Sequence, residues 1–196
     1  MEDAPTFDDI DHEGYNTIRL LCSANAHVQQ KLEEILQNLG DTRFYEWENQ
    51  FGMCLVHRHF KLKEDEVVLE RDLVSQPEAS ASPRYPERWV KLDDKYMAYE
   101  FTNLPTSSPP KRLWDAFIEV VGNAGMSDVL GLFYLPSQIL EGKLAVETAS
   151  EEKRMNTVEY RSTLPASTST IRSGWRIGSL QNKSSGCVHC TGPTHV

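Results

Sequence analysis

Apolar positions follow two different periods along the chain, and these periods predict helices and strands in separate blocks. In 27–39 apolar residues recur every three or four positions, which predicts an amphipathic helix. A second apolar face with helical spacing covers 113–121 and follows Pro109 and Pro110, which favour the first turn of a helix. We expect shorter helical pieces at 127–135 and 136–141.

Strand-like segments lie on both sides of this central helical block. Short apolar and aromatic runs predict strands at 44–48, 53–62, 66–74 and 170–177. Two further pairs of runs flank charged turns and predict hairpins, 89–92 with 96–101 and 144–148 with 155–162. The segment 76–87 contains three prolines among small residues, so we expect a loop there.

The order of these elements favours an α+β fold. Because hairpins dominate and helices do not alternate with single strands, we expect an antiparallel, hairpin-rich sheet that can curve strongly. An N-terminal helix and a central helical block would pack on this sheet. We expect one domain at 13–178, between a disordered acidic lead at 1–12 and a flexible tail at 179–196 with a Cys and His cluster.

The net charge is concentrated at one end of the chain. The 196 residues contain 20 Lys and Arg against 29 Asp and Glu, which gives a formal net charge of −9. More than half of this excess lies in 1–12, which contains five acidic residues and no Lys or Arg. The nearly neutral body does not favour a nucleic acid or an anionic membrane as partner, because phosphate groups bind clustered Lys and Arg.

Several other classes of protein are disfavoured by missing sequence features. No apolar run approaches the roughly 20 residues that cross a bilayer, and the acidic N-terminal segment does not resemble a secretion signal. We therefore expect a soluble, cytoplasmic protein with reduced cysteines. The motifs GxGxxG, GxxxxGK[ST] and GxSxG are missing, so we expect no nucleotide cofactor and no esterase nucleophile.

The pair His57 and His59 is the main candidate for chemistry. On a strand their side chains share one face, with Cα atoms about 7 Å apart at a rise of about 3.4 Å per residue. Two such imidazoles can share a divalent metal, zinc first, or act as catalytic acid and base; the alternative is a plain solvent face. A third metal ligand would come from a neighbouring predicted strand, with Glu70, Glu100 and Glu159 as candidates.

The C-terminal segment offers a second metal hypothesis. Cys187 and Cys190 form a CxxC pair that His195 follows, and two thiolates at this spacing can hold zinc. A structural zinc site usually has four ligands, so His57 or His59 would have to complete this one. That arrangement requires the tail to fold back onto the domain.

Together these patterns favour a protein that binds a small organic molecule. Its His57 and His59 pocket would carry out metal-assisted or histidine-mediated proton transfer, elimination or hydrolysis, as a lyase, isomerase or hydrolase. Two alternatives remain open: a non-catalytic protein-interaction module with regulatory ends, and a structural zinc protein that uses the C-terminal cluster.

Overall fold

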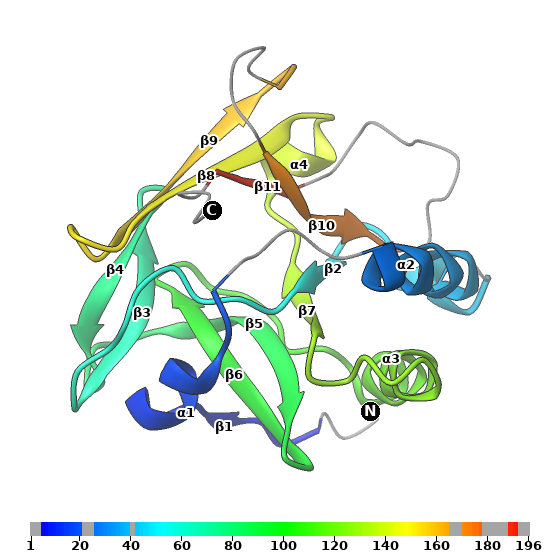
Figure 1. Ribbon diagram of the computed structural model, residues 1–196, viewed down its shortest axis with the longest axis horizontal. Coiled ribbons are helices and arrows are strands. Elements are labelled where there is room, and N and C mark those ends of the chain that lie inside the picture. The colour runs from blue at the N-terminus through cyan, green and yellow to red at the C-terminus, as the bar shows by residue number, and fades with distance from the viewer. Residues whose placement is uncertain (1–4, 21–25, 40–41, 165–169, 178–187, 192–196) are drawn as a thin grey trace.

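The computed structural model describes residues 5–20, 26–39, 42–164, 170–177 and 188–191, and these residues form an α+β fold with a curled sheet (Figure 1). The strands are β1 (Asp8–Asp9), β2 (Phe51–Leu55), β3 (Glu66–Arg71), β4 (Val74–Ala79), β5 (Tyr85–Leu92), β6 (Lys95–Thr102), β7 (Leu130–Tyr134), β8 (Leu144–Ser150), β9 (Met155–Arg161), β10 (Ile171–Arg176) and β11 (Val188–Thr191). The helices are α1 (His12–Thr17), α2 (Ala26–Leu39), the 3-10 helix η1 (Thr42–Trp47), α3 (Lys111–Asn123) and α4 (Ser137–Leu140). None of the described helices is long and apolar enough to cross a bilayer.

The 11 described strands form one sheet that curls until its last strand pairs with a strand near its first edge. Its order is β1-β6-β3-β4-β9-β8-β11-β10-β2-β7-β5, and β5 also pairs with β6. The strands therefore enclose an interior, to which inward-facing side chains of several strands contribute. The expected hairpins are present as β5–β6 and β8–β9, but β1–β6, β3–β6 and β8–β11 are parallel, so the sheet is mixed.

The two long helices lie side by side against the curled sheet (Figure 1). Both were expected, since α2 matches 27–39 and α3 contains 113–121. Their apolar faces join the largest core cluster, to which α2 contributes Leu32 and Ile35 and α3 contributes Trp114 and Phe117. All four tryptophans belong to this cluster, so they fill the core.

Two element predictions are wrong for local reasons. The segment 127–135, expected to be helical, contains strand β7, because a short apolar run that is buried on both faces has no period that separates helix from strand. The segment 44–48, expected to be a strand, lies mostly in η1. There Phe44 and Trp47 are buried three residues apart, which is the spacing that stacks side chains in a 3-10 helix.

The proline-rich segment 76–87 is also more regular than the expected loop. It holds the end of β4 and the start of β5. Pro77 is tolerated in β4 because β4 pairs with β9 only at Val74 and Ser75, so no described strand needs a hydrogen bond from position 77 on that side.

Described parts of both terminal segments, 5–12 and 188–191, contribute to the fold. In the acidic lead, Ile10 is buried and its amide donates to the Ala98 carbonyl, while the Phe7 ring meets Trp114 edge-on at 4.9 Å between centroids. In the tail, β11 lies between β8 and β10. Ile10 and Phe7 therefore anchor the described part of the acidic lead to the domain.

Gly131 marks a close approach of two strands and yields a stability prediction. A Cβ atom there would lie 2.3 Å from the Trp89 carbonyl oxygen, so Gly131→Ala must push β7 away from β5. We expect Gly131→Ala to lower the free energy of unfolding by about 1–3 kcal/mol in urea titrations. In the control Gly122→Ala, inside α3, the new Cβ meets nothing closer than Ser127 Oγ at 3.5 Å, so stability should stay equal or rise by up to about 1 kcal/mol. Equal losses in the two variants would contradict this account.

Candidate metal centre

His57 and His59 lie just after β2, in an extended segment rather than in a strand. The predicted strand 53–62 stops at Leu55, and beyond it Arg58 makes only an isolated bridge with Leu20. The side chains nevertheless alternate, because His57 and His59 are 2% and 5% exposed while Arg58 between them is partly exposed. The face that carries His57 and His59 is therefore buried, and the alternative that it is a plain solvent surface is wrong.

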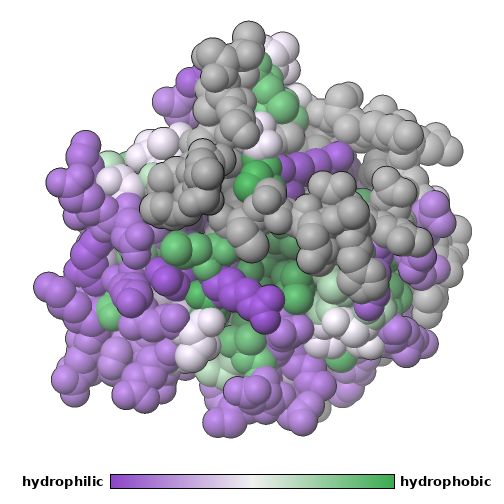
Figure 2. All heavy atoms as spheres, viewed as in Figure 1, coloured by the Kyte–Doolittle hydropathy of each residue, from purple (hydrophilic) through white to green (hydrophobic). Residues whose placement is uncertain are grey.

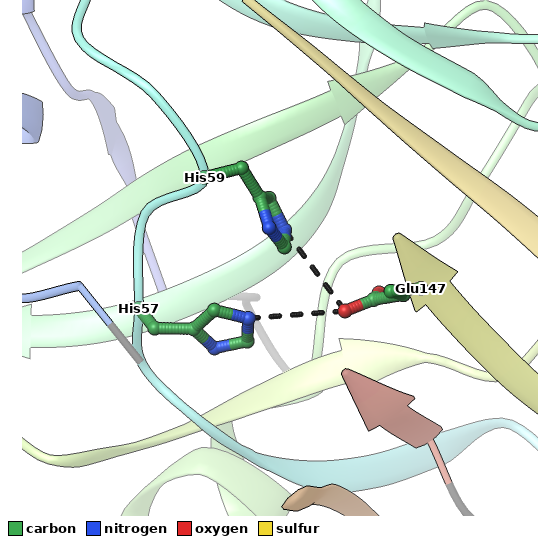
Figure 3. A group of neighbouring side chains, drawn as sticks. All are labelled: His57, His59 and Glu147. Atoms are coloured by element: carbon green, nitrogen blue, oxygen red, sulfur yellow. Dashed lines mark ion pairs between the residues drawn. The ribbon is translucent and has the colours of Figure 1, made fainter. Parts of the chain in front are cut away.

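The two imidazoles converge on one carboxylate oxygen of Glu147, which comes from β8 on the far side of the centre (Figure 3). Oε2 of Glu147 lies 3.8 Å from His57 Nε2 and 3.9 Å from His59 Nε2. The two rings are nearly perpendicular, with centroids 4.7 Å apart. One ligand atom from each residue lies within 4.8 Å of the other two, and all three side chains are buried.

Hydrogen bonds determine which ring nitrogen faces the centre. His57 Nδ1 lies 2.8 Å from the Leu55 carbonyl oxygen, so Nδ1 donates to that oxygen and Nε2 is the ring nitrogen that faces Glu147. His59 Nε2 accepts from Asn156 Nδ2 at 3.3 Å, so the amide occupies the single lone pair of this nitrogen in the metal-free protein. A ring nitrogen that donates to a backbone carbonyl is the usual way in which proteins orient a metal-binding histidine.

Arg88 organises the carboxylates of the centre. Its Nη2 donates to Oε1 of Glu147, and its Nε lies 3.1 Å from Oε2 of Glu100. The second oxygen of each carboxylate turns toward His59, at 3.9 Å for Glu147 and 3.8 Å for Glu100. Two buried carboxyl groups thus share a single guanidinium.

The pKa values follow from burial and from Arg88. Burial alone would raise the pKa of Glu147, but Arg88, together with His57 and His59, holds that pKa well below its usual range. For Glu100, burial prevails over Arg88 and raises the pKa. Burial and the nearby His57 lower the pKa of His59 to about 3, so His59 is neutral at physiological pH, the form that binds metals.

The neutral state of His59 gives the metal-free protein a defined pH dependence. The unfolded chain binds a proton at this residue below about pH 6.5, whereas the folded chain does so only near pH 3, so stability is lost as the pH falls through that window. Between pH 7 and 5 the wild type should lose about 2 kcal/mol more than His59→Gln in urea unfolding with a chelator present. Identical losses in the two proteins would show that His59 titrates normally.

The donor set and its spacing are compatible with a divalent metal. Metal–ligand bonds of about 2.0–2.1 Å in tetrahedral geometry place ligand atoms about 3.3 Å apart. The Glu147 oxygen lies 3.8 and 3.9 Å from the two imidazole nitrogens, and the three ligand atoms lie within 4.8 Å of one another, so metal binding requires inward shifts of several tenths of an ångström to more than one ångström. Two imidazole nitrogens with one carboxylate are ligands that zinc, iron and manganese accept.

The other residues predicted for the site have different positions. Glu70 is partly buried, and burial raises its pKa to about 7, but it lies outside the group of three ligands. Glu159 is exposed and pairs with Arg161. Cys187 and His195 lie outside the described residues. For Cys190 the structure describes the backbone, in β11, where it pairs in register with Glu147.

Glu147 and Arg88 were not anticipated from the sequence. Glu147 is the single charged residue of β8 and follows the buried Ala145 and Val146, whereas Arg88 follows Glu87 and precedes the buried Trp89 and Val90. A charge in such a run is a usable signal, because strands with buried faces seldom accept one unless it has a partner.

A cavity of about 920 Å³ adjoins the centre. His57 lines it together with Leu55, Val56, Ile18 and Met97, which supply much of its apolar surface. On the face of the molecule that Figure 2 shows, polar side chains cover the surface around α1, β3 and β4, and apolar side chains gather toward the middle.

Comparison with known proteins found no match: no protein-family model, curated protein or solved structure resembles the chain. The arguments for a function therefore come from the side chains around His57 and His59 and from the adjoining cavity.

Proposed function

We propose that the protein binds a divalent metal ion through His57, His59 and Glu147 and acts there on a small organic molecule. The reaction class is metal-assisted or histidine-mediated proton transfer, elimination or hydrolysis. The observation that carries this proposal is the convergence of two imidazole Nε2 atoms on one oxygen of a carboxylate whose other oxygen binds Arg88.

The electrostatics of the centre support a cation. Glu147 is held in its charged form, one nitrogen of each imidazole faces its Oε2, and Glu100 adds a second acidic group to the same buried space. Zinc is the first candidate, because neutral imidazole and carboxylate suit it. Iron and manganese are the others, because two histidines and one carboxylate also bind these ions and leave positions for further ligands.

The cavity supports a small-molecule substrate. Its volume of about 920 Å³ lies within the usual range of ligand pockets, and its wall combines apolar side chains and His57 with six acidic residues, Arg19 and Lys95. A molecule in this cavity would therefore lie beside one of the three metal ligands. This position suits a reaction in which the metal polarises a bound group or activates water.

Metal content tests the proposal directly. Wild-type protein dialysed against zinc, iron or manganese should retain one ion per chain, measured by mass spectrometry of the metal, whereas His57→Ala with His59→Ala should retain less than about 0.1. Circular dichroism controls for the fold of the double variant. If the double variant keeps zinc and Cys187→Ser with Cys190→Ser loses it, the C-terminal zinc site is correct instead. A folded wild type that binds no metal would favour histidine acid/base chemistry or an interaction module.

A further inference from the structure

Two buried side chains beside His59 each leave one oxygen without a hydrogen-bond partner among the described residues. Glu100, from β6, is 4% exposed and its Oε1 has no donor; Asn156, from β9, is 1% exposed and its Oδ1 has none. Both side chains reach the same atom, because His59 Nε2 lies 3.8 Å from Glu100 Oε1 and 3.3 Å from Asn156 Nδ2. Glu100 Oε1 therefore faces the metal centre, and the Asn156 amide lies beside the same His59 nitrogen with Nδ2 turned toward it.

A proton on Glu100 would not remove this mismatch. A protonated Oε1 needs an acceptor, and His59 Nε2 at 3.8 Å lies beyond hydrogen-bond distance. Protonation also leaves Asn156 Oδ1 without a donor. Buried acceptors of this kind are almost always matched in folded proteins, so the space beside Glu100 Oε1 calls for a group that offers a polar hydrogen.

The amide of Asn156 is compatible with a metal at this point. Its Nδ2 donates to the His59 lone pair that the metal would use. When that lone pair binds a metal, a half-turn of the amide exchanges Nδ2 and Oδ1 with little change of shape, because the two atoms are nearly the same size. Oδ1 then faces the centre as a second acceptor beside Glu100.

We propose that a protic ligand binds the metal between Glu100 and Asn156. In the resting protein this ligand is water, and a hydroxyl or hydroxamate-type group of a bound molecule takes its place. The inference rests on the proposed metal centre. Water suits the position because its oxygen can bind the metal while its two hydrogens reach Glu100 Oε1 and Asn156 Oδ1. Three protein ligands leave this coordination position open, as catalytic metal sites do. Glu100 and Asn156 are thus positioning residues for the exchangeable ligand.

Cobalt-loaded protein and acetohydroxamic acid provide the test. Co²⁺ takes the place of zinc, and its visible absorption changes when an added ligand alters its coordination. Acetohydroxamic acid binds metals through oxygen and offers a polar hydrogen to the two acceptors. Wild-type protein should show a saturable spectral change with this compound. Asn156→Leu should weaken the apparent affinity for it about tenfold, as loss of one buried hydrogen bond does, with Co²⁺ affinity within about threefold of wild type. Asn156→Asp keeps an acceptor oxygen and adds a negative charge beside His59, so it should bind both Co²⁺ and the compound at least as tightly as wild type.

The outcomes separate this inference from the metal centre itself. Wild-type protein that binds Co²⁺ but shows no spectral response to acetohydroxamic acid overturns the inference, and this arm needs no variant. An Asn156→Leu protein that binds the compound as tightly as wild type also overturns it. Failure of wild-type protein to bind Co²⁺ overturns the proposed function, and the inference with it.

Discussion

Replacement of Arg88 by Met should lower the free energy of unfolding by about 3–5 kcal/mol at neutral pH, which is the usual cost of removing one partner from a buried ion pair. Arg88 contacts Glu147 and Glu100, and both carboxylates are nearly inaccessible to solvent. Met has a similar length and fills most of the space, so the loss comes from two buried carboxylates that no longer share a cation. Urea unfolding of the metal-free wild type and variant measures this loss of stability.

The pH dependence of this loss identifies its cause. Without Arg88, burial should raise the pKa of Glu147 above its unfolded value, so acidification protonates the folded variant and restores part of its stability. The difference from wild type should therefore shrink as the pH falls toward 5. The control Arg161→Met removes the partner of the exposed Glu159 and should cost less than about 1 kcal/mol. A loss at Arg88 that is independent of pH would point to lost packing instead.

Replacement of Glu147 by Gln should weaken zinc binding by at least about a hundredfold, because even residues that only orient a ligand cost 10- to 100-fold when removed. Gln is nearly isosteric but lacks the negative charge, and its oxygen is a weaker ligand. Isothermal titration calorimetry of the metal-free proteins measures the affinity.

Substitutions of two further glutamates serve as controls for the effect of Glu147→Gln on zinc affinity. Glu159 lies on the adjacent strand β9, where it pairs with Val146, and the variant Glu159→Gln should bind zinc with unchanged affinity. Glu100→Gln should weaken zinc binding less than Glu147→Gln does, because Glu100 faces His59 but lies outside the group of three ligands. The assignment of Glu147 as a ligand fails if all three variants bind zinc as the wild type does.

The sequence predicts those parts of the fold that depend on neighbouring residues. Leu32, Ile35 and Leu39 recur at helical spacing and lie in the core face of α2 as expected. The hairpins β5–β6 and β8–β9 form around short charged turns. The closure of the sheet and its parallel pairings, β3 with β6 and β8 with β11, join segments far apart along the chain, so no local pattern indicates them.

The same contrast between local patterns and contacts of distant segments explains which residues of the candidate site could be predicted. Alternation along an extended segment is local, so the spacing of His57 and His59 is enough to place both imidazoles on one side even though β2 ends before them. Glu147 reaches them only because the curled sheet brings β8 across the interior. Among the three glutamates that the sequence suggested, Glu100 lies beside His59, whereas Glu159 points to solvent.

X-ray absorption spectroscopy of zinc-loaded protein tests the central claim most directly. The account predicts a shell of nitrogen and oxygen ligands at about 2.0–2.1 Å, with the multiple-scattering pattern of two imidazoles and no sulfur. The imidazole pattern should disappear in His57→Ala with His59→Ala. A sulfur shell at about 2.3 Å in the wild type would contradict the account and place the zinc on cysteine thiolates instead.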